Sequence, residues 1–155
     1  SEYLIKTYSH LYGIQSVIFR YFNVFGPGQD PSSPYSAVIA LFTDKIKKGE
    51  KISVYGDGSQ TRDFIFVDDV VKANLLAMNS SVSAEVMNIG RGESISILNL
   101  ISTLAKIHNS EIDPEFKAPR TGDIVHSCAD ISKALKLLAF EPQVVLEDGL
   151  RKCLP

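Results

Sequence analysis

The chain has 155 residues, of which 45% are hydrophobic and 22% charged, a composition typical of a soluble globular domain. Its 10 Gly and 7 Pro residues exclude collagen-like and low-complexity classes. Lys and Arg number 16, and Asp and Glu number 18, which gives a net charge of −2. This balance argues against a general binder of nucleic acids or membrane surfaces.

The cysteines, Cys128 and Cys153, form no C-x-x-C motif and no regular spacing with the histidines. They predict reduced thiols in a cytoplasmic protein and no metal site. The hydrophobic runs are shorter than the roughly 18–20 residues of a transmembrane helix. The first residues do not resemble a signal peptide, so we expect no membrane segment.

Helical and strand-like hydrophobic patterns alternate along the first half of the chain. The stretch 23–36 is rich in Gly, Pro, Asp and Ser, and therefore predicts a long functional loop. In chain order we expect a helix over 2–12 ended by Gly13, a buried strand over 16–21, this loop, a helix over 37–48, a strand over 51–55, a turn over 56–59 and a strand over 61–67.

The second half continues the alternation, with polar residues that mark helix starts. We expect Asp68 to cap a helix over 70–78, a strand over 85–89, Ser96 to cap a helix over 97–108, Asp130 to cap a helix through 138, and a final helix over 144–154. The helix after Ser96 is expected to face the core with Leu98, Ile101, Leu104 and Ala105. The whole pattern predicts the α/β class.

Paired glycines invite comparison with phosphate-binding loops. The pairs Gly26-x-Gly28, Gly56-x-Gly58 and Gly90-x-Gly92 do not extend to G-x-G-x-x-G, because Pro31, Thr61 and Ile95 occupy the third position. Turns with positive φ are the simpler interpretation. We therefore expect that this chain alone does not build a dinucleotide site.

Arg62 and Arg120 are the strongest candidates for ligand binding. A guanidinium can grip a phosphate through two hydrogen bonds, so two converging arginines suit a diphosphate. Asp123, three residues after Arg120, can accept both hydroxyls of a ribose. The alternative is that Arg62 with Asp63, and Arg120 with Asp123, are local surface ion pairs.

Several other polar and aromatic residues have a simpler structural interpretation. Asn23 can make a turn, Phe42 and Tyr55 can belong to the core, and Asp57 and the Asp68–Asp69 pair can serve turns and helix caps. His126 has no visible partner in the sequence. No nucleophile–base pair emerges from the pattern.

Four ordered motifs resemble nucleotide-sugar epimerases of the extended short-chain dehydrogenase/reductase family. They span nearly the whole chain: Arg20-Tyr21-Phe22-Asn23-Val24-Phe25-Gly26-Pro27, Gly56-Asp57-Gly58-Ser59-Gln60-Thr61-Arg62-Asp63-Phe64 followed by Val67-Asp68-Asp69-Val70, Asn88-Ile89-Gly90, and Asp130-Ile131-Ser132-Lys133-Ala134. Gln29-Asp30-Pro31 and Tyr35-Ser36-Ala37-Val38-Ile39 look most like UDP-glucose or UDP-N-acetylhexosamine 4-epimerases.

The resemblance implies the last Rossmann-type elements over residues 1–22 and a small mixed α/β substrate-binding domain over 23–155. It also implies NAD as cofactor, a UDP-sugar as substrate, reaction through a 4-keto intermediate, and a homodimer at full length. The implied site residues are Phe22 beside the nicotinamide, Asn23 on the diphosphate or sugar, Ala37, Val38 and Phe42 along the nucleotide, Tyr55 near the base, Arg62 and Arg120 on the phosphates, and Asp123 on the ribose.

Departures from the family pattern are as informative as the matches. The family's Gly-rich NAD loop and its Tyr-x-x-x-Lys dyad are absent from this sequence. We therefore expect a C-terminal part that holds no catalytic residue, with the dyad just upstream of Ser1. The alternatives are a 4,6-dehydratase or decarboxylase of the same family, or a non-catalytic nucleotide-sugar-binding module. Ala139 stands where relatives often end a helix with Gly, at some cost in stability.

Overall fold

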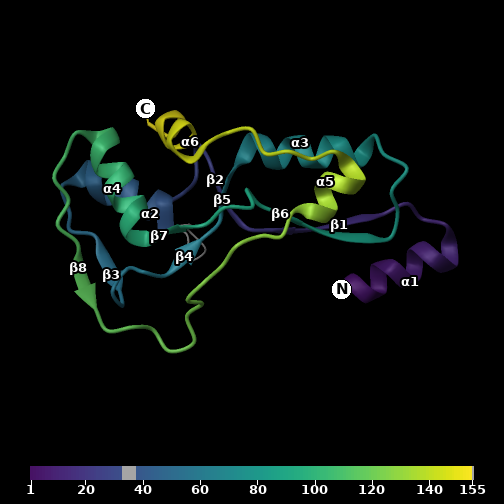
Figure 1. Ribbon diagram of the computed structural model, residues 1–155, viewed down its shortest axis with the longest axis horizontal. Helices are drawn as coiled ribbons and strands as arrows, with labels where there is room; N and C mark the ends of the chain where they lie inside the picture. The colour runs from purple at the N-terminus through teal and green to yellow at the C-terminus, as the bar shows by residue number, and fades with distance from the viewer. Residues whose placement is uncertain (33–37, 155) are drawn as a thin grey trace.

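The computed structural model describes residues 1–32 and 38–154. Helices and short strands form two neighbouring groups, with β2, β5, β4 and β7 between them (Figure 1). One group contains β1, β6, α3 and α5, with α1 beside them, and the other contains α2, α4, β3 and β8. The predicted α/β class is confirmed.

The strands pair two by two, and the pairing is mostly parallel. Parallel pairs join β1 (Val17–Tyr21) to β6 (Glu85–Ile89), β2 (Asn23–Phe25) to β5 (Phe64–Phe66), and β3 (Ser53–Tyr55) to β8 (Glu115–Lys117), while β4 (Thr61–Arg62) runs antiparallel to β7 (Ile95–Ser96). The predicted loop over 23–36 is therefore wrong at its start, where Asn23 pairs with Phe64. The predicted strand over 61–67 is broken at Asp63.

The helices lie close to their predicted positions. They are α1 (Glu2–Tyr12), α2 (Val38–Lys48), α3 (Val67–Met78), α4 (Ile97–His108), α5 (Ser132–Leu138) and α6 (Leu146–Lys152). Ser96 caps α4 as predicted, because its hydroxyl accepts a hydrogen bond from the Asn99 N–H. Gly13 ends α1 in the left-handed conformation, with φ of 67°.

Three details of the helix predictions are wrong. Asp68 lies inside the first turn of α3, so its carboxylate makes no cap. Asp130 precedes the start of α5, where its Oδ1 accepts from the Ser132 N–H in a local turn. Ile101 and Leu104 are buried as predicted, but Leu98 is exposed, and Ile97 and Leu100 complete the buried face of α4.

Two hydrophobic clusters meet at β5. Phe64 and Phe66 belong to a cluster with Phe25, Phe42 and residues of α4, whereas Ile65 belongs to a second cluster with residues of β6 and α5. Successive side chains of a strand point to opposite sides, so this short buried strand serves both clusters. Arg62 and Asp63 immediately precede β5 and are thereby held at the junction between them.

Candidate functional site

The predicted site residues gather around one cavity of about 530 Å³ between α2, β3, β4 and the segment 119–125. Its lining includes every predicted binding residue that the structure describes: Phe22, Asn23, Val38, Phe42, Tyr55, Arg62, Arg120 and Asp123. Ala37 lies outside the described residues. A volume of this size lies in the range of small-molecule sites.

Arg62 is anchored by a fixed set of acceptors. Its Nη1 donates to the carbonyl oxygens of Thr61 and Ile124 at 2.8 and 2.6 Å, and its Nη2 donates to Asp123 Oδ1 at 2.8 Å. The side chain is 17% exposed. These contacts hold the guanidinium at the cavity wall. The alternative of a surface ion pair with Asp63 is wrong, because Asp63 is fully buried and faces elsewhere.

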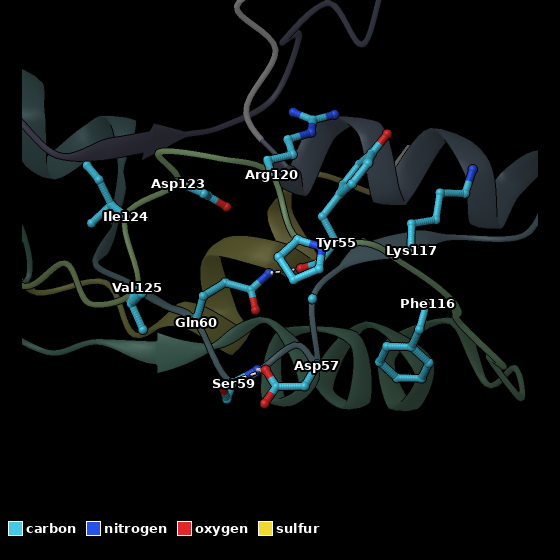
Figure 2. Close-up of a pocket in the computed structure, with 12 residues that line it drawn as sticks. Tyr55, Asp57, Ser59, Gln60, Phe116, Lys117, Arg120, Asp123, Ile124 and Val125 are labelled. Atoms are coloured by element: carbon cyan, nitrogen blue, oxygen red, sulfur yellow. Dashed lines mark hydrogen bonds between the residues drawn. The ribbon is translucent and has the colours of Figure 1, made fainter.

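Arg120 lies over the ring of Tyr55, with 3.8 Å between the guanidinium carbon and the ring centroid. Figure 2 shows the two side chains next to each other at the cavity edge. A hydrogen-bonding contact from Arg120 and its positive charge lower the pKa of the Tyr55 hydroxyl below its ordinary value. Arg120 therefore makes a cation–π contact with Tyr55. The ion-pair partner of Asp123 is Arg62, not Arg120.

A second cavity, of about 810 Å³, adjoins the first and shares its central residues. Tyr55, Gln60, Arg120 and Asp123 line both. Figure 2 shows these side chains around the second cavity, with Phe116 and Val125 at its margins. We call these two adjoining cavities together the arginine pocket.

The segment that carries Arg120 and Asp123 is held to β4 by few contacts. The Thr61 N–H donates to the Val125 carbonyl at 2.8 Å, next to the contacts of Arg62 with Asp123 and Ile124. Thr61 Oγ1 also lies 3.4 Å from His126 Nδ1, so His126 has a partner that the sequence did not reveal. This contact is long and exposed, and we assign it no chemistry.

Gln60 and Asp63 were missed as contributors to the pocket. Gln60 Nε2 donates to the Tyr55 carbonyl at 2.9 Å and supports the wall that both cavities share. Asp63 carries three backbone hydrogen bonds behind Arg62. Both residues lie beside Arg62 in the motif over 56–64, and this position was the sequence signal that could have identified them. The structural interpretation of Phe42 as a core residue is confirmed, since it is 3% exposed and also lines the cavity.

Ser1, the residue before which the catalytic dyad is expected, takes no part in the arginine pocket. It is exposed and directly precedes α1, where its carbonyl accepts from the Ile5 N–H at 3.1 Å and its side chain makes no cap. It lines neither cavity of the pocket. Ser1 therefore lies outside the arginine pocket, and the dyad expected upstream of it stays a prediction.

The space beside the paired glycines differs from one position to the next: it is open at Gly28 and Gly56 and filled at Gly26 and Gly90. Gly28, Gly56, Gly58 and Gly92 have positive φ, as expected for turns. A Cβ on Gly26 would lie 2.5 Å from Val67 Cγ1, and one on Gly90 would lie 2.5 Å from the Ala129 Cβ. Protein side chains therefore fill the space beside these two glycines, and the residues present do not fit the NAD pyrophosphate there.

The described residues also lack the features of a metal site and of a membrane span. Within 1–32 and 38–154, no group of three or more His, Cys, Asp or Glu side chains is placed to hold a metal ion. Over the same ranges no helix is both long and apolar enough to cross a membrane. Cys128 and Cys153 are free thiols, as predicted.

Comparison with known proteins identifies the class. Residues 1–90 match the model of the NAD dependent epimerase/dehydratase family. The chain belongs to this family, and the resemblance to nucleotide-sugar epimerases is confirmed.

Individual relatives are UDP-sugar 4-epimerases. UDP-glucose 4-epimerase from Mycolicibacterium smegmatis is 35% identical over 97% of this chain and 48% of its own length. The structure of the Thermotoga maritima UDP-glucose 4-epimerase with UDP-glucose has 40% identity and a TM-score of 0.93, over 98% of this chain and 48% of that one. UDP-N-acetylglucosamine 4-epimerase from Methanobrevibacter ruminantium M1, in complex with UDP-N-acetylmuramic acid, has 42% identity and a TM-score of 0.93, over 98% and 49%. The chain spans about half the length of these relatives.

Proposed function

We propose that this chain is the C-terminal, UDP-sugar-binding half of an NAD-dependent nucleotide-sugar 4-epimerase. The observation that carries the proposal is the convergence of Arg62, Arg120, Asp123 and Tyr55 on one pocket, from three separate parts of the sequence. Three of the similar proteins are named UDP-glucose or UDP-N-acetylglucosamine 4-epimerases, which supports the same assignment.

In this proposal Arg62 and Arg120 bind the diphosphate. The acceptors described for Arg62 use both protons of Nη1 and one of Nη2, so in the described part of the chain the Nε–H and one Nη2–H are free for phosphate oxygens. Arg120 is exposed where it lines the pocket. Charge-assisted hydrogen bonds from both residues would fix the diphosphate in place.

The remaining residues would hold the nucleoside and the sugar. The Asp123 carboxylate is 41% exposed and can accept hydrogen bonds from the ribose hydroxyls. The Tyr55 ring would lie near the base, while Val38, Phe42 and Ala37 would line the nucleotide. Asn23, which follows β1 and donates to the Asp63 carbonyl at 3.0 Å, would contact the diphosphate or sugar.

The proposed reaction needs redox chemistry that NAD supplies in this family. Because side chains fill the space beside Gly26 and Gly90, we assign to the chain only Phe22 at the cofactor boundary. We propose that the acid–base residues lie outside it, upstream of Ser1. The contribution of the chain is therefore to bind and orient the sugar nucleotide, which keeps the reacting carbon in one position.

Calorimetric titration of the chain with UDP tests the binding assignment. We expect saturable binding that Arg120→Ala weakens by about 1.5–3 kcal/mol, the value of a hydrogen bond to a charged group. Arg151→Ala is a matched control, because the exposed Arg151 side chain pairs with Glu147 on α6 and lines neither cavity of the pocket. Equal UDP affinity in wild type and Arg120→Ala would refute the phosphate assignment.

A 4,6-dehydratase is the second candidate, because the family model covers both epimerases and dehydratases. Product analysis by NMR, on the longest protein that contains this chain, distinguishes the candidates. A 4-epimerase inverts the configuration at C4 of the sugar, and a 4,6-dehydratase removes water from it. A decarboxylase releases carbon dioxide from a uronic acid. UDP binding without turnover in that protein would favour a non-catalytic binding module.

A further inference from the structure

The buried carboxylate of Asp63 lies directly behind the arginine pocket. Asp63 is 0% exposed, and it separates β4, which carries Arg62, from β5. Its Oδ1 accepts from the Arg91 N–H at 2.7 Å, and its Oδ2 accepts from the Gly92 and Ala129 N–H groups at 2.9 and 3.0 Å. Among the described residues it has no cationic side chain as partner, so backbone dipoles alone stabilise it.

These hydrogen bonds join three segments that are far apart in the sequence. One contains Arg62, the second is the turn after β6, and the third is the segment that leads from Asp123 to Ala129. The close approach also explains Gly90, because a Cβ there would lie 2.9 Å from Asp63 Oδ2. Asp63 thus connects two of the four motifs that the sequence revealed.

The segment from Asp123 to Ala129 connects the pocket to the hydrogen bond between Ala129 and Asp63, which anchors it. Ala129 is fixed by Asp63 at one end, and Val125 is fixed by the Thr61 N–H at the other. Between β4 and this segment lie the contacts of Arg62 with Asp123 and with the Ile124 carbonyl. Movement of the anchor would therefore displace Arg62 and Asp123 relative to each other.

We propose that Asp63 is a positioning residue. Its hydrogen bonds from the Arg91, Gly92 and Ala129 N–H groups, which we call the clamp, hold Arg62 and the Asp123 segment in the geometry that binds the diphosphate and ribose. The clamp itself follows from the contacts described. Its effect on ligand binding rests on the proposed function.

Asp69 provides a matched control within the same chain. It is 3% exposed and accepts from the Gln143 and Val144 N–H groups at 2.9 and 3.0 Å. Like Asp63 it is a buried carboxylate held by backbone N–H groups, but its hydrogen bonds fasten α3 to the segment before α6. Like Asp63 it lines neither cavity of the arginine pocket, but its partners Gln143 and Val144 lie outside β4 and the segment that carries Asp123. Substitution by Asn removes the same charge and keeps the same shape at both positions.

The test compares wild type, Asp63→Asn and Asp69→Asn at a temperature where all are folded. Hydrogen exchange of the Thr61 amide, which bonds to Val125, should accelerate about tenfold in Asp63→Asn only. UDP affinity should fall about tenfold in Asp63→Asn and less than about twofold in Asp69→Asn. If Asp63→Asn does not fold, Gly90→Ala should accelerate the same amide, because its Cβ would push on Ala129 Cβ at 2.5 Å and on Asp63 Oδ2 at 2.9 Å and so disturb the hydrogen bond between these two residues.

The two readouts separate the two proposals. Unchanged exchange at Thr61 in Asp63→Asn, or equal acceleration in both variants, would overturn the clamp. If wild type does not bind UDP, the proposed function fails while the exchange experiment still decides the clamp. Accelerated exchange with unchanged UDP affinity would show that Asp63 does not position the ligand-binding residues.

Discussion

At the scale of single residues, the arginine pocket is organised by contacts within the chain itself. Arg62 is held by Asp123 and by carbonyl oxygens, and Arg120 rests on Tyr55. A preorganised cation loses less entropy on binding than a flexible one. The same contacts make the chemical properties of these residues measurable in the free protein.

The Tyr55 hydroxyl offers such a measurement. Contact with Arg120 lowers its pKa, so Tyr55 should lose its proton below pH 10, earlier than an ordinary tyrosine. The folded pKa lies below the unfolded one, so the interaction stabilises the fold above the unfolded pKa, and this stabilisation is lost as pH falls through the folded pKa. NMR titration of labelled tyrosines should show the low pKa and its return towards 10 in Arg120→Gln. An identical Tyr55 titration in both proteins would contradict the contact.

At the scale of elements, the end of α5 contains a strained residue. Ala139 adopts the left-handed conformation with φ of 50°, where a side chain is unfavourable. Ala139→Gly should therefore raise the free energy of unfolding by about 0.5–1 kcal/mol, measured by urea denaturation. Ala105→Gly, inside α4, is the control and should lower it by about 1 kcal/mol. A loss of stability in Ala139→Gly would show that strain at this position is not the dominant effect.

The first helix presents an apolar surface without a partner in the described structure. Tyr3, Leu4, Leu11 and Tyr12 are all at least 60% exposed, and within α1 only Ser9 is buried. Exposed apolar surface of this kind promotes association. We therefore expect the chain to self-associate, with an apparent mass in light scattering that rises with concentration.

Substitutions on α1 test the origin of this association. Leu4→Lys combined with Leu11→Lys should reduce the apparent mass towards that of a monomer, because the charges oppose burial of the stripe. Ser102→Lys, at an exposed position of α4, adds a charge away from α1 and should change it less. Association that persists in the double variant would place the contact on another surface. The expected homodimer of the longer protein stays a prediction.

At the scale of the whole molecule, local patterns predicted the order of elements well because each carries its own signal. Ser96 and Gly13 mark helix ends by local chemistry, and both were predicted. Asp63 and Asp69 were misjudged because their partners are backbone N–H groups far away in sequence. β2 was missed because its pairing partner, β5, lies far away in the sequence, with Asn23 opposite Phe64, and because turn-forming residues follow β2 closely.

The arginine pocket was predicted at the level of its residues but not of its contacts. Motif resemblance indicated Arg62, Arg120 and Asp123, and the structure brings them to one cavity. The pairing of Arg62 with Asp123 and of Arg120 with Tyr55 depends on how the segment after β8 crosses β4. No local pattern encodes that crossing. Individual binding roles, and the domain boundary after residue 22, stay predictions.

At this scale the proposed function predicts that the chain binds UDP without binding NAD. UDP should stabilise the folded chain by mass action, by about 2.7 kcal/mol at a concentration a hundred times its Kd. For a domain of this size that corresponds to a rise in Tm of roughly 5–10 °C.

NAD at millimolar concentration should leave Tm nearly unchanged, because side chains of Val67, Ala129 and Asp63 occupy the space beside Gly26 and Gly90. Thermal unfolding followed by circular dichroism measures both ligands on the same sample, and uridine controls for the diphosphate. Stabilisation by NAD as large as that by UDP would mean that this chain builds a dinucleotide site by itself. Stabilisation by UDP and not by NAD or uridine would show that this chain contains the binding site for the nucleotide diphosphate. It would also indicate that the residues that bind the cofactor lie outside this chain.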